Sequence, residues 1–350
     1  TSLSLVRASH RPEAEGRPAP GMEFFMEKIA LVGSYGADVR PMLEMRLKGA
    51  MEVETVANES EFDRLADVEY VILRVLAMKR ATIEAMPRLK LIQRWGVGFD
   101  KVDIAAAGER GVPVAIAPEA NVTPVSELAL LLMLALYRNL VKLHNGMVQG
   151  RWEKEKFIDN SFMIKGKTVG LIGCGAIGRQ VAEKVRAFGA QVVYYDVFRL
   201  PETTEQKLGL TFRELDEVLA SADIISLHLP LLDSTRGMIG RREIALMKPS
   251  ALLINTARGE IINTVALAEA LAGKRIAGAG LDVFDPEPLE ADSPLRALDN
   301  VVLTPHVGGN TADISMDMVD ICLENIFAVR DGRPLSPKVL VNRQYLKNDV

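Results

Sequence analysis

Short apolar runs and segments of helical periodicity alternate along most of the chain. Ten runs of strand length are nearly continuous in Val, Ile, Leu and Ala, as expected for parallel strands that are buried on both faces. The predicted strands are residues 28–33, 68–75, 89–94, 112–117, 167–173, 191–196, 223–230, 251–257, 277–283 and 301–306. The predicted helices between or after them are residues 103–111, 176–189, 214–221, 241–247, 263–273 and about 312–330.

This order predicts an α/β protein with two Rossmann-like, doubly wound parallel-sheet domains and a cleft between them. A length of 350 residues also exceeds the usual size of one core. Residues 1–22 lack an apolar signal region, so we expect a disordered extension there. The expected first domain is discontinuous and comprises residues 23–121 and 315–350. The expected second domain comprises residues 122–314.

One predicted helix, from Thr123 to about His144, is apolar around most of its circumference. Thr123 can cap it, and Pro124 is acceptable in its first turn. Its most apolar stretch, residues 128–137, is ten residues long, whereas a membrane-spanning helix needs about 20. Such a helix fits an interface between domains or subunits better than solvent. We therefore expect no membrane span and a homodimer.

The overall composition is that of an ordinary globular enzyme, with 48% apolar and 25% charged residues. A net charge of −4 gives no general attraction to nucleic acid or to anionic membranes. Cys174 and Cys322 form no disulfide framework, which suits a reducing cytoplasm. None of the four histidines lies within five positions of another, so the spacing predicts no metal site.

A glycine-rich turn joins the predicted strand 167–173 to a helix. Gly173, Gly175 and Gly178 have G-x-G-x-x-G spacing, and Asp196 ends the next strand, 18 residues after the last glycine. Glycines there permit a tight turn, close approach of a pyrophosphate and close helix packing. Asp196 would accept hydrogen bonds from ribose hydroxyls and repel a 2′-phosphate, so the motif predicts NAD rather than NADP. If NADPH were also used, Arg199 would be the phosphate partner; the alternative is a glycine-rich turn that binds no dinucleotide.

Three residues with complementary chemistry come just after predicted strands, where open α/β sheets bind ligands. They are Arg258, Glu287 and His306. Histidine can exchange an alcohol proton near neutral pH, a carboxylate can orient the ring, and a guanidinium can grip a substrate carboxylate. Taken singly, each could instead be a surface ion pair, a solvated acid or a strand-end histidine.

Five segments in order carry a resemblance to a known family. They are LIGCGAIGR followed by YYD, LHLPLLDSTRGMI (227–239), LLINTARGEIIN (252–263), AGLDVFDPEPL (279–289) and LTPHVGG (303–309). Over roughly residues 28–340 the chain resembles the D-isomer-specific 2-hydroxyacid dehydrogenases. WGVGFDKVD (95–103) resembles the substrate loop of the phosphoglycerate, glyoxylate and hydroxypyruvate reductases of that family. The resemblance implies NAD-dependent interconversion of a D-2-hydroxy acid and a 2-oxo acid, with 23–121 plus 315–350 as the substrate domain and 122–314 as the NAD-binding domain.

The resemblance also implies residue roles. Arg258 would bind the substrate carboxylate, Glu287 would orient His306, and His306 would be the acid/base. Val97 and Gly98 would offer backbone N–H groups to the substrate carboxylate. Asp282 is implied near the nicotinamide carboxamide. The full set of implied cofactor contacts is Thr123, Gly173, Gly175, Ala176, Ile177, Gly178, Asp196, His228, Pro230, Thr235, Thr256, Ala257, Arg258, Asp282, His306 and Gly308.

Substrate identity stays open at this stage. Leu128 follows Glu127 where the family usually has a histidine, and Trp95 is larger than the small residue common in the substrate loop. Arg74 and Arg94 end two predicted strands and could hold a distal phosphate or carboxylate on the substrate, or form surface ion pairs.

Two other functions use the same motifs. One is oxidation of phosphite or formate; Glu287 argues against formate, which has no alcohol proton to remove. The other is an NADH-sensing binding protein that resembles the C-terminal-binding-protein corepressors.

Overall fold

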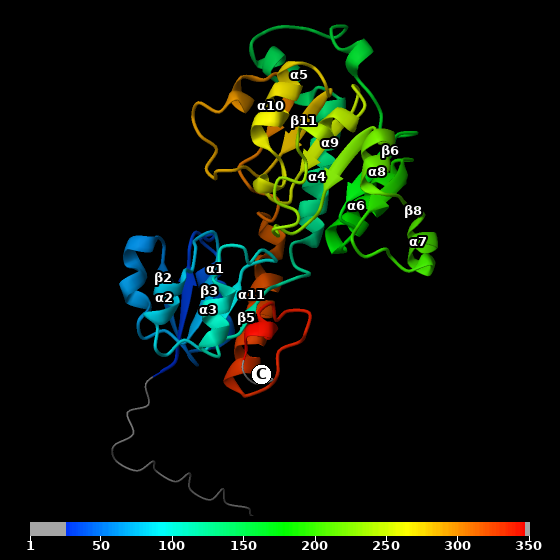
Figure 1. The fold of residues 1–350 in the computed structure, drawn as a ribbon. Coiled ribbons are helices and arrows are strands. Elements are labelled where there is room, and N and C mark those ends of the chain that lie inside the picture. The colour runs from blue at the N-terminus through cyan, green and yellow to red at the C-terminus, as the bar shows by residue number, and fades with distance from the viewer. Residues whose placement is uncertain (1–25, 347–350) are drawn as a thin grey trace, which may run out of the picture.

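The computed structural model describes residues 26–346, so the extension expected for residues 1–22 lies outside the described range. Two parallel sheets carry helices on their faces, one in the lower, blue-to-cyan part of Figure 1 and one in the upper, green-to-yellow part. We call them, with the helices packed on them, the five-stranded unit and the seven-stranded unit. The predicted α/β class with two doubly wound sheets is confirmed.

The five-stranded sheet has the order β2-β1-β3-β4-β5, and all its neighbouring strands are parallel. This is the flavodoxin-like order of doubly wound folds. Its elements are β1 Lys28–Val32, α1 Val39–Leu47, β2 Glu52–Val56, β3 Tyr70–Leu73, α2 Arg80–Glu84, β4 Leu91–Arg94, α3 Ile104–Glu109 and β5 Val114–Ala115.

The seven-stranded sheet has the order β12-β11-β10-β9-β6-β7-β8, again with parallel neighbours throughout. Counted from β6, this is the dinucleotide-binding order extended by one strand. Its elements are α4 Val122–Tyr137, α5 Leu140–Val148, β6 Thr168–Ile172, α6 Ala176–Ala187, β7 Gln191–Tyr195, α7 Glu202–Leu208, β8 Leu210–Phe212, α8 Leu215–Ser221, β9 Ile224–Leu227, α9 Arg241–Leu246, β10 Leu252–Asn255, α10 Thr264–Ala272, β11 Gly278–Leu281 and β12 Val301–Leu303.

The apolar pattern missed the edge strands β2 and β8. In β2, which reads EVETV, only Val53 and Val56 are buried. In the three residues of β8, only Leu210 is buried. These two edge strands are partly exposed and need no continuous apolar run, so their sequences lack the signal that identified the other ten strands.

The prediction of one long helix starting at Thr123 is wrong in two respects. The cap position is Asn121, whose side chain makes no capping hydrogen bond, while Thr123 Oγ1 accepts a hydrogen bond from Gln180 Nε2 at 3.2 Å. The helix also breaks after α4, because Asn139 adopts the left-handed conformation with φ of 51°. α4 and α5 are therefore separate helices with a bend of 65° between them.

The apolar helix α4 packs on the seven-stranded sheet, against β10 and β11, and on α6. Its Ala129, Leu132 and Met133 are buried. Gly280 of β11 permits the close approach, since a Cβ there would lie 2.9 Å from Cβ of Leu132. Among the described residues no single helix is long and apolar enough to cross a membrane; α4 and α5 meet that criterion only when joined across their bend.

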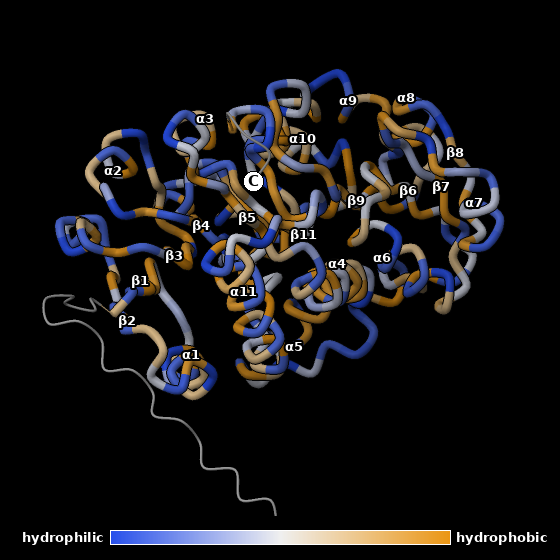
Figure 2. Tube along the Cα trace, turned by 90° about the horizontal axis from the view of Figure 1, so that it is seen from below, coloured by the Kyte–Doolittle hydropathy of each residue, from blue (hydrophilic) through white to orange (hydrophobic). Residues whose placement is uncertain are grey.

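After the last strand of the seven-stranded sheet, the chain returns to the five-stranded unit. Helix α11, Ser315–Arg330, packs on α1 and β4 and buries Met318, Val319 and Cys322 there. In Figure 1 this orange helix lies beside the blue and cyan elements. Figure 2 shows the strands of both sheets as mainly hydrophobic and much of the peripheral chain as hydrophilic. The cores thus form between the sheets and the helices, and α11 completes the core of the five-stranded unit.

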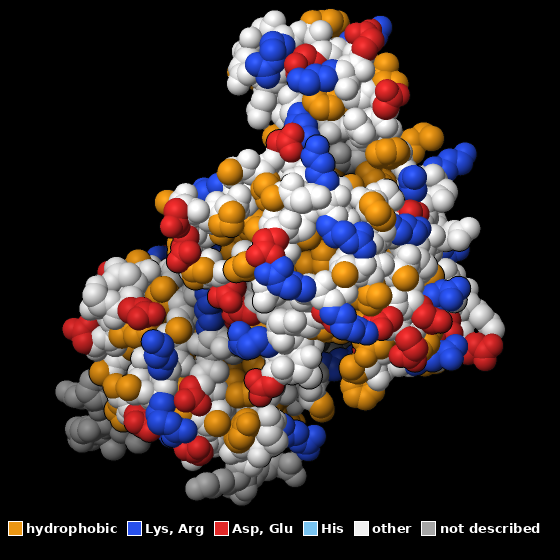
Figure 3. Space-filling view, turned by 45° about the horizontal axis from the view of Figure 1, so that its top comes forward, with side chains coloured by type: hydrophobic (Ala, Val, Ile, Leu, Met, Phe, Trp, Pro, Cys, Tyr) orange, Lys and Arg blue, Asp and Glu red, His pale blue; other side chains and the backbone are white. Residues whose placement is uncertain are grey.

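The surface carries charges of both signs. On the face shown in Figure 3, Lys and Arg side chains alternate with Asp and Glu, with hydrophobic side chains between them. Exposed ion pairs include Arg46 with Asp320 at 2.7 Å, which joins α1 to α11. Such an exposed pair is screened by solvent and contributes little, so burial of apolar surface accounts for most of the packing.

Candidate active site

The glycine-rich loop joins β6 to α6 at the carboxyl end of the seven-stranded sheet. Gly173 has φ of 94°, and a Cβ there would lie 2.4 Å from the carbonyl oxygen of His228. A Cβ at Gly178 would lie 2.4 Å from the carbonyl oxygen of Gly173. Both positions therefore need glycine. A Cβ at Gly175 would meet nothing within 4 Å, so the space in front of it is open.

Helix α6 presents its N-terminus to this open space. Gly175 is its N-cap residue, and no side chain caps the N–H groups of its first turn, which begins with Ala176 and Ile177. Exposed N-terminal N–H groups and the helix dipole attract anions. The loop and the helix therefore fit the pyrophosphate of a dinucleotide.

Asp196 follows β7 and lies beside the glycine loop. Its Oδ2 accepts a hydrogen bond from the Cys174 N–H at 2.8 Å, and its Oδ1 accepts one from the Phe198 N–H at 3.2 Å. The carboxylate is thus fixed next to the loop, where it can accept further hydrogen bonds from ribose hydroxyls.

His228, Pro230 and Thr235 belong to the loop after β9. The ring Nε2 of His228 lies 3.0 Å from Ser226 Oγ, and burial lowers the pKa of His228 to about 4. Thr235 Oγ1 donates to the Pro230 carbonyl at 2.7 Å and accepts from the Leu232 N–H at 2.8 Å. The threonine therefore fixes the loop, and its contact with the cofactor stays a prediction.

Asn255 shapes the turn that presents Arg258. It is 1% exposed, donates from Nδ2 to the Arg258 carbonyl at 2.8 Å and accepts at Oδ1 from the Ala257 N–H at 3.0 Å. The buried hydroxyl of Thr256 makes no hydrogen bond with any described residue. A polar atom without a partner at a strand end is available to a ligand.

Arg258 reaches across to the five-stranded unit. Its Nε donates to Asp100 Oδ1 at 2.9 Å, and its Nη1 donates to the Ala257 carbonyl at 2.7 Å. A Cβ at Gly98 would lie 1.7 Å from Nη2 of Arg258, so this glycine admits the guanidinium. Burial opposes ionisation of Asp100, but the charge and hydrogen bond of Arg258 outweigh it and lower the pKa of Asp100. Arg258 and the predicted substrate loop, with Val97 beside Gly98, thus lie together.

His306 and Glu287 form a hydrogen-bonded pair. Nδ1 of His306 lies 2.9 Å from Oε2 and 3.0 Å from Oε1 of Glu287. The Phe284 N–H also donates to Oε1 of Glu287 at 3.2 Å. Burial opposes ionisation of Glu287, but the hydrogen bond and charge of His306 outweigh it and lower the pKa of Glu287. The ring is 45% exposed, so Nε2 is the nitrogen that can exchange a proton with a ligand.

Asp282 fixes the backbone turn that carries His306. Its Oδ1 accepts from Thr304 Oγ1 at 2.6 Å and from the Val307 N–H at 2.9 Å, and its Oδ2 accepts from the Gly308 N–H at 2.9 Å. His306 itself has φ of 53°, an unfavourable conformation for a side-chain-bearing residue. Because Asp282 is only 1% exposed, the geometry favours a positioning role, and the contact with the carboxamide stays a prediction.

Two arginines of the five-stranded unit, Arg74 and Arg94, make different contacts. Arg94 is 8% exposed; its Nε donates to the Gly98 carbonyl at 2.6 Å, and its buried Nη1 makes no hydrogen bond with any described residue. Arg74 donates from Nη1 to the Ser34 carbonyl at 2.9 Å and from Nη2 to Oδ1 of Asn310. Arg94 therefore supports the predicted substrate loop, and Arg74 connects the two units.

Trp95 packs edge-on against Tyr35, with ring centroids 5.3 Å apart. Tyr35 donates its hydroxyl to the Ile72 carbonyl at 2.7 Å, and the Arg74 guanidinium lies 5.9 Å from its ring centroid. The large indole is thus held in place by Tyr35, in the predicted substrate-loop segment. Leu128 lies near the turn after His306, 3.6 Å from where a Gly308 Cβ would be.

Sequence reasoning missed three polar residues. Asp100 and Asn255 hold Arg258, and Asn121 lies between the two units, with its Nδ2 3.7 Å from a Gly96 Cβ position and its own Cβ 3.6 Å from a Gly309 Cβ position. Oδ1 of Asn121 is buried and makes no hydrogen bond with any described residue. In the sequence, each of these residues is only a polar side chain next to a motif. That position does not indicate which residue it would contact in the fold.

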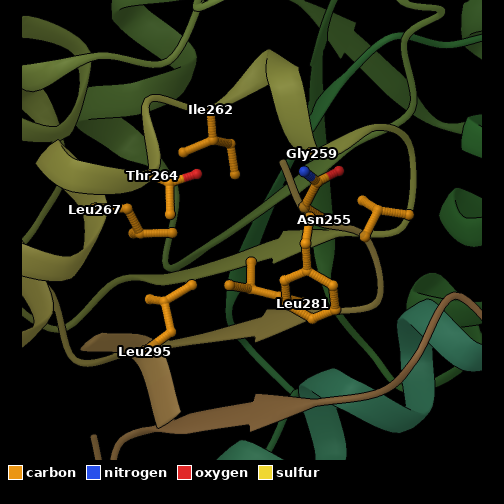
Figure 4. A pocket seen from close by; sticks show the side chains of 9 residues that line it. Asn255, Gly259, Ile262, Thr264, Leu267, Leu281 and Leu295 are labelled. Atoms are coloured by element: carbon orange, nitrogen blue, oxygen red, sulfur yellow. The ribbon is translucent and has the colours of Figure 1, made fainter. Parts of the chain in front are cut away.

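A small hollow lies behind the Arg258 segment, between the ends of β10 and β11 and helix α10. Figure 4 shows its lining of mainly apolar side chains, including Ile262, Leu267 and Leu295. Its volume of about 10 Å³ is near the minimum for one water, so it is packing space and not a substrate site. Among the described residues, no group of three His, Cys, Asp or Glu side chains is arranged to hold a metal ion.

Comparison with known proteins identifies the class. Residues 130–308 match the model of the D-isomer specific 2-hydroxyacid dehydrogenase, NAD binding domain. A glyoxylate reductase of Thermofilum pendens is 38% identical over 332 residues, covering 94% of this chain and 93% of that protein. A D-3-phosphoglycerate dehydrogenase of Methanocaldococcus jannaschii is 38% identical over 88% of this chain. The NAD-dependent formate dehydrogenase of Staphylococcus aureus, solved with NAD, has a TM-score of 0.80 at 30% identity over 90% of this chain and 99% of that one.

The chain belongs to the D-isomer specific 2-hydroxyacid dehydrogenase family and carries its NAD-binding domain. The resemblance drawn from the motifs, and NAD as the cofactor, are confirmed. The chain spans 58% of the length of the phosphoglycerate dehydrogenase that it matches.

We expect Asp282→Asn to destabilise the protein. The amide NH₂ cannot accept a hydrogen bond and would face a donor of the turn that ends at Gly308, so the free energy of unfolding should fall by about 2–3 kcal/mol. Urea denaturation measures this change. Asp285→Asn, at an exposed position in the same region, is the matched control and should leave the unfolding free energy within about 0.5 kcal/mol of wild type. Equal stability of the two variants would contradict the assigned role of Asp282.

Proposed function

We propose that this protein is an NAD-dependent oxidoreductase that interconverts a D-2-hydroxy acid and a 2-oxo acid. The observation that carries the proposal is the placement of Arg258 beside the Gly98 loop together with the His306–Glu287 pair, at the carboxyl edge of the NAD-binding sheet. Beside the hydride donor, reduction of a 2-oxo acid requires a group that binds the substrate carboxylate and a group that supplies a proton.

Each residue has one task in the proposed reaction. The dinucleotide, when bound against Gly175 and the α6 N-terminus, supplies or accepts the hydride. Arg258 binds the substrate carboxylate and polarises the adjacent carbonyl, with the N–H groups of Val97 and Gly98 as further donors. His306 donates a proton from Nε2 to the oxygen that develops negative charge, and takes it back in the reverse direction. Glu287 holds the ring through Nδ1 and stabilises its charged form.

We expect His306→Asn to lower kcat by roughly 10²–10⁴, since a general acid/base is lost, with NADH affinity nearly unchanged. The measurements are NADH oxidation with glyoxylate or hydroxypyruvate and an NADH binding titration. His144→Asn, at an exposed histidine of α5, should keep the wild-type kcat. The acid/base role would be refuted by a His306→Asn enzyme of normal kcat.

Formate and phosphite, assayed with NAD, test the alternative donors. Tight NADH binding with no turnover of any of these substrates would favour an NADH sensor.

The pH dependence follows from the pair. Because the pKa of Glu287 is lowered, its carboxylate is ionised near neutral pH and can accept a hydrogen bond from Nδ1 of His306. Reduction consumes the proton that His306 donates, so the rate of 2-oxo acid reduction should fall as pH rises, and the rate of oxidation should rise. Glu287→Gln should move both inflections to lower pH. If the inflections stay at the same pH in Glu287→Gln, then Glu287 does not affect the protonation of the His306 ring.

Arg94 and Arg74 are proposed to bind a distal anion on a longer substrate. The support is the buried Nη1 of Arg94, which has no partner among the described residues. Arg94→Ala should raise KM for a phosphorylated 2-oxo acid at least about tenfold more than for glyoxylate, because only the former has a second anion. Since Arg94 also supports the Gly98 carbonyl, some loss with glyoxylate is expected; equal losses with both substrates would rule out the distal role.

We propose that residues 23–121 with 315–350 form the substrate domain and that 122–314 form the NAD-binding domain. The packing of α11 on α1 and β4 supports this division. A homodimer is proposed through α4, α5 and the segment after them, which arches over the end of the seven-stranded unit in Figure 1. The exposed apolar side chains there are Leu131, Leu140, Val141, Met147, Val148, Trp152, Ile158, Phe162 and Met163.

Light scattering at micromolar concentration should give about twice the 38.3 kDa chain mass. Val148→Asp, which places a charge on a side chain that is 72% exposed in one chain, should shift the equilibrium toward monomer. Val265→Asp, at an apolar position on α10 that is 62% exposed, is the control and should leave the dimer intact. A stable wild-type monomer would overturn the proposed interface.

A further inference from the structure

The loop after β7 carries an arginine close in sequence to the residue expected to read the ribose. Asp196 begins this loop and is fixed to the glycine loop through the Cys174 N–H. Arg199 comes three residues later, before α7. An arginine near this strand end can accommodate the 2′-phosphate that distinguishes NADP from NAD. Its position in the fold therefore bears on cofactor choice.

Arg199 is held against α7 by Glu205. Its Nε donates to Oε1 and its Nη2 donates to Oε2, both at 2.9 Å, which is the bidentate geometry of a strong guanidinium–carboxylate pair. The Glu205 side chain is 8% exposed. The guanidinium also lies 5.3 Å from the ring centroid of Phe212 on β8. These contacts occupy the Nε and Nη2 donors that a bidentate pair with a phosphate would need.

The same carboxylate fixes the backbone of the loop. The buried Tyr194 hydroxyl donates to Oε1 of Glu205 at 2.6 Å and accepts from the Leu200 N–H at 2.9 Å. The hydrogen bonds from Arg199 and then Tyr194 lower the pKa of Glu205 to about 2, so the carboxylate is ionised at any physiological pH. Both partners of the pair are thus charged at any pH at which the protein would meet a dinucleotide.

We propose that Glu205 is a cofactor-specificity residue, which keeps Arg199 folded against α7 and away from the 2′ position of the adenosine ribose. The proposal rests on the NAD site assigned above. Asp196 and Glu205 then act in different ways. Asp196 repels a 2′-phosphate directly, whereas Glu205 withholds the nearby cation that could bind one. Removal of Asp196 alone should not create an NADP site.

Dissociation constants of NADH and NADPH, measured by nicotinamide fluorescence without a 2-oxo acid, test this inference. The variants are Asp196→Ser, Asp196→Ser with Glu205→Gln, and each of these with Arg199→Ala. Glu202→Gln in the Asp196→Ser background is the matched control. It lies on the same helix and removes the same charge, but Glu202 accepts a hydrogen bond from Gln206 and acts on Arg199 only through a minor Coulombic attraction. Parallel kcat/KM values with glyoxylate report on turnover.

Release of Arg199 should let it pair with the 2′-phosphate, so the double variant should bind NADPH at least about tenfold more tightly than Asp196→Ser. Adding Arg199→Ala should abolish that gain, and Glu202→Gln should produce none. In Asp196→Ser itself, Arg199→Ala should change the NADPH constant less than about twofold, because the arginine is still held.

The inference is overturned if Glu205→Gln gives no gain, if the gain survives Arg199→Ala, or if Glu202→Gln matches it. It is also overturned if Arg199→Ala weakens NADPH binding tenfold while Glu205 is intact; this comparison does not depend on the folding of a Glu205 variant. Absence of turnover with the expected binding constants would overturn the proposed reaction and leave the role of Glu205 supported.

Discussion

All strands of the seven-stranded sheet run in the same direction, so their carboxyl ends share one edge. This constraint positions the site. The glycine loop follows β6, Asp196 follows β7, and Arg258 and His306 follow β10 and β12. Loops at that edge can converge on one ligand although they are far apart in sequence, because the hydrogen-bonded register of the strands fixes where each loop begins.

Buried polar side chains then fix the backbone conformation of those loops by hydrogen bonds. Asn255 and Asp282 are each 1% exposed and bond the backbone of the turns that present Arg258 and His306. A buried amide or carboxylate must find partners, since an unpaired one costs about 1–3 kcal/mol. The same requirement stabilises the left-handed conformation at His306, which is unfavourable for the residue itself.

The site is completed by contact between the two units. Asp100 bonds Arg258 and Asn310 bonds Arg74, so each guanidinium of these pairs has a partner from the opposite unit. In the proposed reaction, a substrate carboxylate would share Arg258 with Asp100, whose own charge is stabilised by that arginine. That arrangement would couple substrate binding to the contact between the two units through this one side chain.

The sequence by itself determined ten of the described strands, the glycine loop, and the placement of Arg258, Glu287 and His306 after strand ends, because continuous apolar runs and motif spacing are local properties of the chain. It missed the edge strands β2 and β8, whose solvent-facing sides need no apolar residues, and it joined α4 to α5 across Asn139. The partners of the site, such as Asp100 for Arg258 and Glu205 for Arg199, were decided only by the tertiary structure. A charged residue has many possible partners along a chain, and only the packing of loops and helices brings one of them within hydrogen-bonding distance.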